Sequence, residues 1–267
     1  MLTPRKELGN RIIVNNTQLT INISRTSVQV AEVLRSSQEV VSNHFIRFKG
    51  GSPKSYKEEL KSFFESLSLK DEYQEYTMAW CSIKYALVPI RVFNDSTPPK
   101  IMELLFGDSI EKEDSDFNRL AELNIVDVYE IPDWVKSFFI VKFPQLIFKH
   151  EHAMTLRALF QGSTYKLKTI VSVFDDYMNV SIIQKNELKF SNAFEYHNAE
   201  DIVYHLMFVV EQKGFKEEKG EIQFYFQNKE SQEFANKAIE LLKEIQMINS
   251  HTILDSENSA KLQLLCV

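Results

Sequence analysis

Polar and apolar residues alternate along two stretches of the chain that lie about 150 residues apart. In the first stretch, apolar side chains stand at every second position in residues 19–23 and again in residues 28–30, with a polar break at residues 24–27. This pattern predicts two strands joined by a short turn. Residues 169–183 repeat the alternation, and each copy is followed by the motif Ser-Asn-x-Phe, which begins at Ser42 and again at Ser191. The matches predict an internal duplication.

The predicted elements follow the same order in each half of the chain: three strands, a helix, a strand and a helix. In the first half, apolar residues recur at helical spacing from Tyr56 to Leu67, after a break at Gly50 and Gly51. This order combines antiparallel hairpins with parallel crossovers, so helices must cover the sheets. We predict an α/β protein of two tandem lobes, with mixed sheets covered by helices and a cleft between the lobes.

A glycine marks the end of the first half, and a weak alternation of polar and apolar residues marks the end of the second. Gly162 follows the last predicted helix of the first half. The tail from Ser250 alternates weakly at residues 252–254 and 261–265, which predicts an additional edge strand. The predicted parts are an N-terminal arm (1–16), a first lobe (17–162) and a second lobe (163–267).

The composition excludes several classes of protein. Hydrophobic residues make up 44% of the 267 residues and charged residues 25%, as in globular domains. The net charge of −6 argues against a general surface for nucleic acids or anionic membranes. Cys81 and Cys266 lie too far apart to indicate a disulfide framework or a metal site. Without a signal-peptide segment or a run of ~18 apolar residues, we expect a cytoplasmic protein with no membrane insertion and no nucleic-acid partner.

Both copies of the repeat resemble phosphate-binding loops. Residues 21–33 resemble the first phosphate loop of actin-like ATPases, most closely the branch with the cytoplasmic PilM-like proteins of type IV pilus assembly, and residues 171–182 resemble the second loop. Residues 85–89, 128–132 and 148–150 resemble an uncharacterised Bacteroidetes family, domain of unknown function 3822 (DUF3822), and this likeness covers nearly the whole chain. The resemblance implies an actin-like (ASKHA, ribonuclease H-like) fold and brings no known activity.

The chain departs from the actin-like pattern at the positions that would bind nucleotide. The pattern places a carboxylate for the Mg²⁺ shell at the end of the first strand of each lobe, and glycines in each phosphate loop. It also places two glycines on the adenosine side, after the late strand of the second lobe. The residues found at these positions are Asn22, Ser24, Arg25, Thr26, Ser172, Phe174, Asp175, Asp176, Gln227 and Asn228.

These replacements argue against ordinary ATP hydrolysis. Glycine lets backbone N–H groups approach a phosphate, whereas Phe174 adds bulk at that point. Two carboxylates in the second loop repel a polyanion, by roughly 4 kcal/mol per pair of charges at ~4 Å and an effective dielectric constant of 20. We expect no cofactor and no bound metal.

Alternatives stay open for the same residues. Asp175 and Asp176 could themselves hold a cation, although aspartate is also favoured in tight hairpin turns. Residues 150–152, His-Glu-His, have a metal-like composition, but a strand-to-helix junction explains them better. Arg25 and Lys49 could bind an anion in the cleft. The acidic residues 108–116 lack the glycine and terminal glutamate of a calcium loop.

The leading hypothesis is a non-catalytic binding or scaffold protein on a degenerate actin-like fold. The alternative is a divergent nucleotide-binding ATPase or kinase-like enzyme that uses Asp175 or Asp176 for its metal. A third hypothesis is assembly, by self-association or by docking to a protein partner through an exposed edge strand or the tail, residues 250–267.

Overall fold

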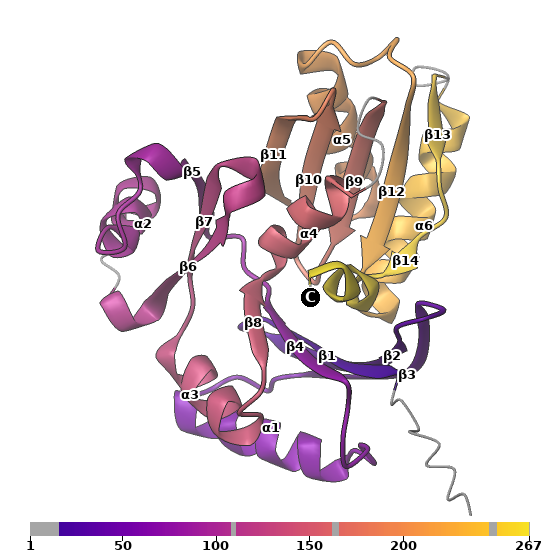
Figure 1. The fold of residues 1–267 in the computed structure, drawn as a ribbon. Coiled ribbons are helices and arrows are strands. Elements are labelled where there is room, and N and C mark those ends of the chain that lie inside the picture. The colour runs from indigo at the N-terminus through magenta and orange to yellow at the C-terminus, as the bar shows by residue number, and fades with distance from the viewer. Residues whose placement is uncertain (1–15, 108–110, 162–165, 246–249, 267) are drawn as a thin grey trace, which may run out of the picture.

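The computed structural model describes residues 16–107, 111–161, 166–245 and 250–266. Within these ranges the strands form three sheets (Figure 1). Two large sheets lie one above the other in the view of Figure 1, and the third, smaller sheet stands to one side. Most of the predicted N-terminal arm and the start of the predicted acidic loop lie outside the described residues.

The first large sheet has the strand order β3-β2-β1-β4-β8, with β1 antiparallel to β2 and parallel to β4. Helices α1 and α3 cover one face, where Leu60, Phe64 and Phe139 pack with Ile21 and Trp80 of the strands (Figure 1). The elements are β1 (Thr17–Ile23), β2 (Ser27–Leu34), β3 (Glu39–Arg47), α1 (Pro53–Ser66), β4 (Glu75–Trp80), α3 (Asp133–Lys142) and β8 (Ile147–His150).

The second large sheet has the order β11-β10-β9-β12-β13, and β14 also pairs with β12. Helices α5 and α6 pack on one face, where Leu206 and Ala238 contact Val171 and Phe224 of the strands. The elements are β9 (Leu167–Val173), β10 (Tyr177–Gln184), β11 (Glu187–Glu195), α5 (Ala199–Gln212), β12 (Gly220–Phe226), α6 (Lys229–Glu244), β13 (His251–Ile253) and β14 (Glu257–Asn258).

The two large sheets repeat the same first four strands. The order β3-β2-β1-β4 in the first sheet corresponds to β11-β10-β9-β12 in the second. The pairing of β2 with β3 shifts its register between Glu32 and Val33. The pairing of β10 with β11 shifts between Ile182 and Ile183, at positions 150 residues further along the chain. A shared irregularity at matched positions supports the predicted duplication, and the predicted lobe boundaries stay a prediction.

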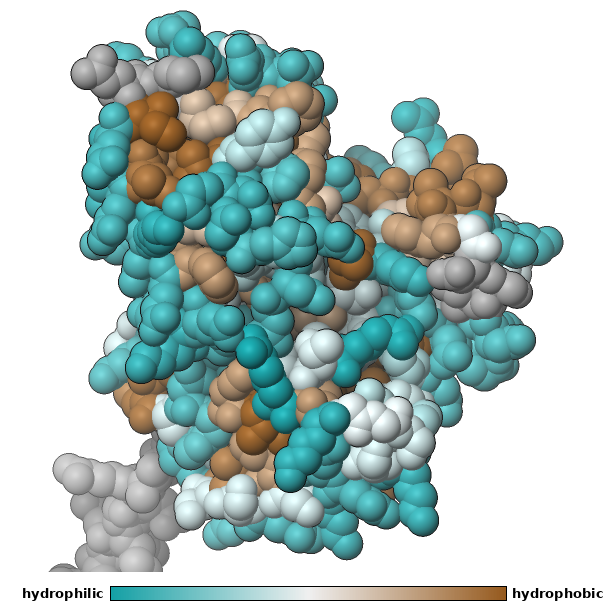
Figure 2. Space-filling view, turned by 180° about the vertical axis from the view of Figure 1, so that it is seen from behind, coloured by the Kyte–Doolittle hydropathy of each residue, from teal (hydrophilic) through white to brown (hydrophobic). Residues whose placement is uncertain are grey.

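The third sheet projects from the segment between β4 and α3. Its strands have the order β5-β7-β6, and helix α2 packs on it through Met102. The side chains of Val92, Leu104 and Leu105 are 73%, 84% and 56% exposed, and apolar colour gathers on this projection at the right of Figure 2. The elements are β5 (Tyr85–Pro89), α2 (Pro98–Phe106), β6 (Ser115–Leu120) and β7 (Ile125–Glu130).

Helix α4 (Glu151–Leu159) and a 3₁₀ helix at Ser259–Cys266 lie between the two large sheets (Figure 1). They cover the face of β1 that the alternating pattern makes polar, so Gln18, Thr20 and Asn22 are buried. A half-polar strand ordinarily exposes its polar face to water. The polar face of β1 is therefore buried in an internal contact, and its hydrogen-bonding groups need partners there.

The structure confirms the first of the two stretches that predicted a strand in the tail and contradicts the second. Residues 251–253 form β13, which pairs in parallel with β12. Residues 261–265, whose alternation also predicted a strand, belong to the 3₁₀ helix. In a 3₁₀ helix side chains three residues apart lie on one side. Ser259 with Leu262, and Ala260 with Gln263, are buried in this way.

Candidate functional site

The two turns predicted as phosphate loops face each other across the space between the large sheets. At the first turn Ser24 N donates to Ser27 O over 2.9 Å. At the second turn Phe174 N donates to Tyr177 O over the same distance. The Thr26 hydroxyl donates to the Asp175 carboxylate across the gap over 3.5 Å. The structure therefore brings together the two predicted loops, one from each sheet.

Asp175 is the centre of a polar network at this junction. Its Oδ1 atom accepts hydrogen bonds from Asn228 Nδ2 over 2.5 Å and from Arg47 Nη2 over 3.2 Å. Arg47 also pairs with Glu230 over 2.8 Å. The hydrogen bond to Asp175 is the largest effect that raises the pKa of Arg47. The carboxylate of Asp175 is therefore already bound by groups from both sheets.

The predicted adenosine-side residues cap helix α6. Asn228 is the N-cap residue, and its Oδ1 atom accepts from Ser231 N over 3.0 Å. In return the backbone N–H of Asn228 donates to Ser231 Oγ over 2.9 Å, which completes a capping box. The neighbouring Gln227 is buried, and its backbone N–H donates to Val173 O over 3.3 Å. Both residues thus have structural contacts at the start of the helix.

Phe174 fills the space between the sheets. Its side chain is 2% exposed and stacks on Tyr177 with the ring centroids 4.7 Å apart. It packs with Ala79 of β4, with Cys81 directly after that strand, and with Met154 of α4. An aromatic side chain thus occupies the point where a glycine in the actin-like pattern would leave room for a ligand.

Asn22 contacts the C-terminal 3₁₀ helix. Its Nδ2 atom donates to Ser259 Oγ over 3.1 Å and to Gln29 Oε1 over 2.7 Å. Its Oδ1 atom accepts from Gln263 Nε2 over 2.7 Å, and the same Nε2 donates to Ile21 O over 3.0 Å. The C-terminal segment therefore supplies hydrogen-bond partners to the end of β1.

The cavity that remains at this position has a volume of about 10 Å³. Asn22, Glu151, Phe174, Leu262 and Gln263 are among the residues that line it. One water molecule needs about 10–15 Å³ on the same measure. This cavity, between the described residues that line it, therefore holds about one water molecule and has no room for a nucleotide.

The other predicted site residues lie apart from this contact. Ser172 is fully buried within β9. Arg25 is directed to the end of β7, where it forms an ion pair with Glu130. Loss of hydration, and then the neighbouring Asp175 carboxylate, raise the pKa of Asp176. Lys49 lines a groove between β3 and α1 together with Arg47, and Arg25 is not among the residues that line it.

The strand-to-helix junction predicted at residues 150–152 is confirmed, and its three polar side chains have separate partners. His150 Nδ1 lies 2.9 Å from Asp127 Oδ2, and both side chains are fully buried. His152 Nε2 lies 2.5 Å from Ser191 Oγ. Burial lowers the pKa of His152 to about 4. Among the described residues, no group of three or more His, Cys, Asp or Glu side chains is placed to hold a metal ion.

Glu151 begins α4 and lines the residual cavity. Its Oε1 atom accepts a hydrogen bond from Asn179, and its side chain is 4% exposed. Burial raises the pKa of Glu151 well above its ordinary value, which favours the neutral acid.

In the part of the chain that the structure describes, no helix is long and apolar enough to cross a membrane.

Sequence reasoning missed Arg47, Ser259 and Gln263, and it placed Glu151 only at a strand-to-helix junction. No local motif distinguishes Arg47, which closes an edge strand. Ser259 and Gln263 meet Asn22 from more than 230 residues away in the sequence. The His-Glu-His triplet was the one available signal for Glu151, but the pattern did not place it beside the first hairpin.

Comparisons with known proteins give a family and a fold. The profile of the family "Protein of unknown function (DUF3822)" matches residues 10–245. A Bacteroides thetaiotaomicron protein with an actin-like ATPase fold and unknown function superposes with a TM-score of 0.68 at 17% identity, over 95% of this chain and 96% of that one.

Two further structures share the fold. In the PilM–PilN type IV pilus biogenesis complex, the matched chain gives a TM-score of 0.55 at 9% identity, covering 92% of this chain and 93% of its own. The ethanolamine utilization protein EutJ from Carboxydothermus hydrogenoformans gives 0.50 at 7% identity, covering 99% and 90%. No curated protein matches the sequence. At these identities the likeness establishes the actin-like ATPase fold alone.

Proposed function

The chain belongs to the DUF3822 family of proteins of unknown function and has an actin-like ATPase fold, and from this premise we propose that it is a non-catalytic binding or scaffold protein. Its C-terminal segment closes the site where the fold would bind nucleotide. The predicted phosphate-binding positions have lost the carboxylates and glycines that the chemistry needs. The function is then to present protein surfaces in a fixed arrangement.

The observation that carries the proposal is the contact of Asn22 with Ser259 and Gln263, over 3.1 and 2.7 Å. Asn22 stands where the actin-like pattern has a carboxylate of the Mg²⁺ shell. A carboxamide is neutral and uses its oxygen and nitrogen here for bonds within the protein. A nucleotide would have to displace the segment and leave these buried groups without partners, at about 1–3 kcal/mol each.

The alternative, an enzyme that uses Asp175 or Asp176 for a metal, has less support. Asp175 already accepts hydrogen bonds from Arg47 and Asn228. A cation would have to compete with the Arg47 guanidinium for the same oxygen.

A protein partner is the finer part of the proposal. One structure with this fold is a complex, the PilM–PilN type IV pilus biogenesis complex. The exposed apolar side chains Val92, Leu104 and Leu105 on the projecting sheet offer surface for such a contact. Exposed apolar patches on soluble domains mark interaction sites. Self-association through the same patch is the other form of this proposal.

Nucleotide binding and turnover test the non-catalytic proposal. The melting temperature should stay unchanged when MgATP or MgADP is added up to millimolar concentration, and phosphate release should equal the buffer background. Stabilisation by several degrees at sub-millimolar MgATP would overturn the proposal. Phosphate release that disappears in Asp175→Asn but persists in Asp95→Asn, a surface carboxylate paired with Arg119, would establish the enzyme instead.

A further inference from the structure

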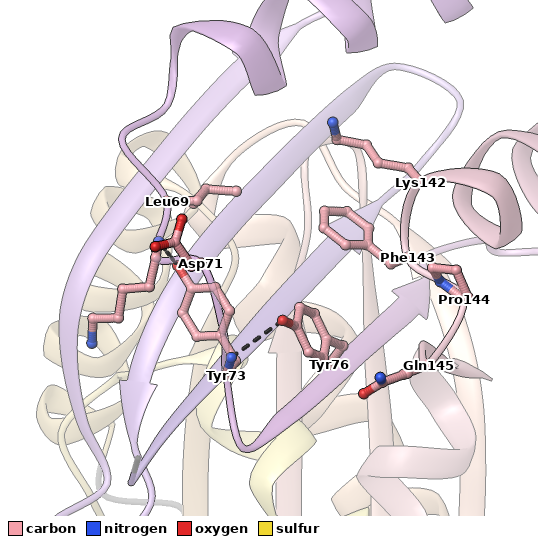
Figure 3. Close-up of a pocket in the computed structure, with 9 residues that line it drawn as sticks. Leu69, Asp71, Tyr73, Tyr76, Lys142, Phe143, Pro144 and Gln145 are labelled. Carbon is pink, nitrogen blue, oxygen red and sulfur yellow. Dashed lines mark hydrogen bonds between the residues drawn. The ribbon is translucent and has the colours of Figure 1, made fainter. Parts of the chain in front are cut away.

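A second cavity lies at the opposite end of the first large sheet. It has a volume of about 290 Å³ and opens between the loop that precedes β4 and the connection from α3 to β8 (Figure 3). Strand β4 runs from this cavity to the closed junction, because Tyr76 lines the cavity and Trp80 lies beside the first hairpin. The cavity is therefore separate from the site proposed above.

Aromatic rings form the inner wall. The Tyr73 and Tyr76 rings meet edge to face at 5.5 Å, and the Tyr76 and Phe143 rings lie 5.8 Å apart. The hydroxyls are held by the protein: Tyr76 OH accepts from Tyr73 N over 3.2 Å, the bond drawn in Figure 3, and Tyr73 OH accepts from Lys70 N over 2.8 Å. The rings are thus fixed before any ligand arrives, and they offer apolar surface to it.

The charge at the rim is positive. Lys142 lies 5.0 Å from the Phe64 centroid and 5.5 Å from the Phe143 centroid, and among the described residues it forms no ion pair. Lys70 donates to the Thr17 hydroxyl over 2.9 Å. Asp71 is the acidic residue among those that line the cavity. Two lysines against one aspartate leave a net charge of +1 on a chain whose total is −6.

We propose that this cavity binds a carboxylate attached to an apolar body the size of one large side chain. The apolar body packs on Tyr73, Tyr76 and Phe143, and the carboxylate pairs with Lys142 at the rim. The volume lies at the lower limit of about 300–1,000 Å³ for small-molecule pockets, which fits one ring or one branched chain. Both a free organic acid and the terminal phenylalanine of a polypeptide have this chemistry.

Calorimetric titration of the full chain with phenylacetate tests the proposal. Phenylacetate should bind at least tenfold more tightly than phenylacetamide, which has the same body and no charge. Lys142→Gln should weaken phenylacetate about tenfold and leave phenylacetamide unchanged. Asp71→Asn should strengthen phenylacetate severalfold, because it removes the opposing charge.

Lys213→Gln is the matched control. Lys213 lies 5.4 Å over the Phe190 ring in the second sheet, a similar arrangement far from this cavity in the sequence, and its replacement should leave binding unchanged. Equal binding of acid and amide, or no effect of Lys142→Gln in a variant with unchanged melting temperature, would overturn the proposal. A short peptide that ends in phenylalanine distinguishes the sources: tighter binding than phenylacetate supports a polypeptide terminus, and weaker binding supports a free acid.

Discussion

The two ends of the first large sheet differ in how much space their side chains leave. At the junction with the second sheet the remaining cavity measures about 10 Å³, whereas the cavity beside Tyr76 measures about 290 Å³. At the closed end Phe174 and Gln263 supply apolar contact and hydrogen bonds from within the chain. At the open end the half-buried rings of Tyr76 and Phe143 and the exposed Lys142 line the cavity. Under the proposed function, the chain thus fills the place where the actin-like pattern has its ligand and leaves room at the other end of the sheet.

The largest expected effect comes from emptying the closed end. Phe174→Ala removes a ring that is 2% exposed and should lower the free energy of unfolding by about 3–5 kcal/mol. Urea denaturation measures this change. Phe208→Ala, on a side chain that is 48% exposed, is the control and should cost much less. A cost for Phe174→Ala similar to that of the control would show that the junction is not packed in solution.

A pH titration of stability tests whether water is excluded around α4. The pKa of His152 is about 4 in the folded chain against 6.5 for the free side chain, so the unfolded chain binds more protons between these values. The free energy of unfolding therefore does not depend on His152 protonation above about pH 6.5, and this titration lowers it by about 3 kcal/mol as the pH drops to 4.

Glu151 titrates with the opposite sign, because its raised pKa makes the folded chain bind the additional proton. The comparison of wild type with His152→Gln isolates the histidine. Their difference in free energy of unfolding should change by about 3 kcal/mol between pH 7 and pH 4. A constant difference across this range would mean that His152 is hydrated.

A smaller effect is expected from the C-terminal segment. Gln263→Leu keeps the size of the side chain but leaves Asn22 Oδ1 and Ile21 O without this donor, so stability should fall by about 1–3 kcal/mol. The matched change Gln184→Leu removes a bond to exposed Glu218 and should cost less than about 1 kcal/mol. Hydrogen exchange at the backbone of β1 should increase in the first variant alone.

The smallest effect concerns the ion pair across the junction. Asp175→Asn keeps the shape and removes the charge that pairs with Arg47, whose side chain is 50% exposed. Because the arginine is accessible to solvent, the cost should be about 1 kcal/mol or less and should shrink further in 1 M salt. Denaturation at low and high salt measures this. A loss that does not depend on salt would assign the effect to the hydrogen bond from Asn228.

Much of the fold follows from local pattern. Alternation at residues 19–33 and 169–183 predicted both central hairpins, and the comparisons confirm the actin-like class. The residues that close the site could not be predicted from local pattern, because Gln263 contacts Asn22 through tertiary structure and not through any sequence period. The strand predicted at residues 261–265 is wrong for a related reason. Weak alternation there reflects burial between two sheets, which also suits a 3₁₀ helix.

The open cavity was equally hidden from sequence reasoning. Lys70 comes from the loop before β4 and Lys142 from the end of α3, and their meeting depends on β4 and β8 being neighbours in the sheet. Strand order is a property of the whole fold, and single-sequence periodicity carries little information about it. The aromatic residues of the wall were assigned to elements by pattern, but nothing in the pattern placed them around a common space.

The position of the C-terminal segment also affects the order in which the chain gains its structure during synthesis. Ala31 and Val33 of β2 bury their side chains against Ala260 and Leu264. A ribosome adds more than 200 residues between these two sets. Domains commonly fold as they emerge, from the N-terminus onward. We expect Ala31 and Val33 to stay uncovered until Ala260 and Leu264 have been made, more than 100 residues after β8 completes the first sheet.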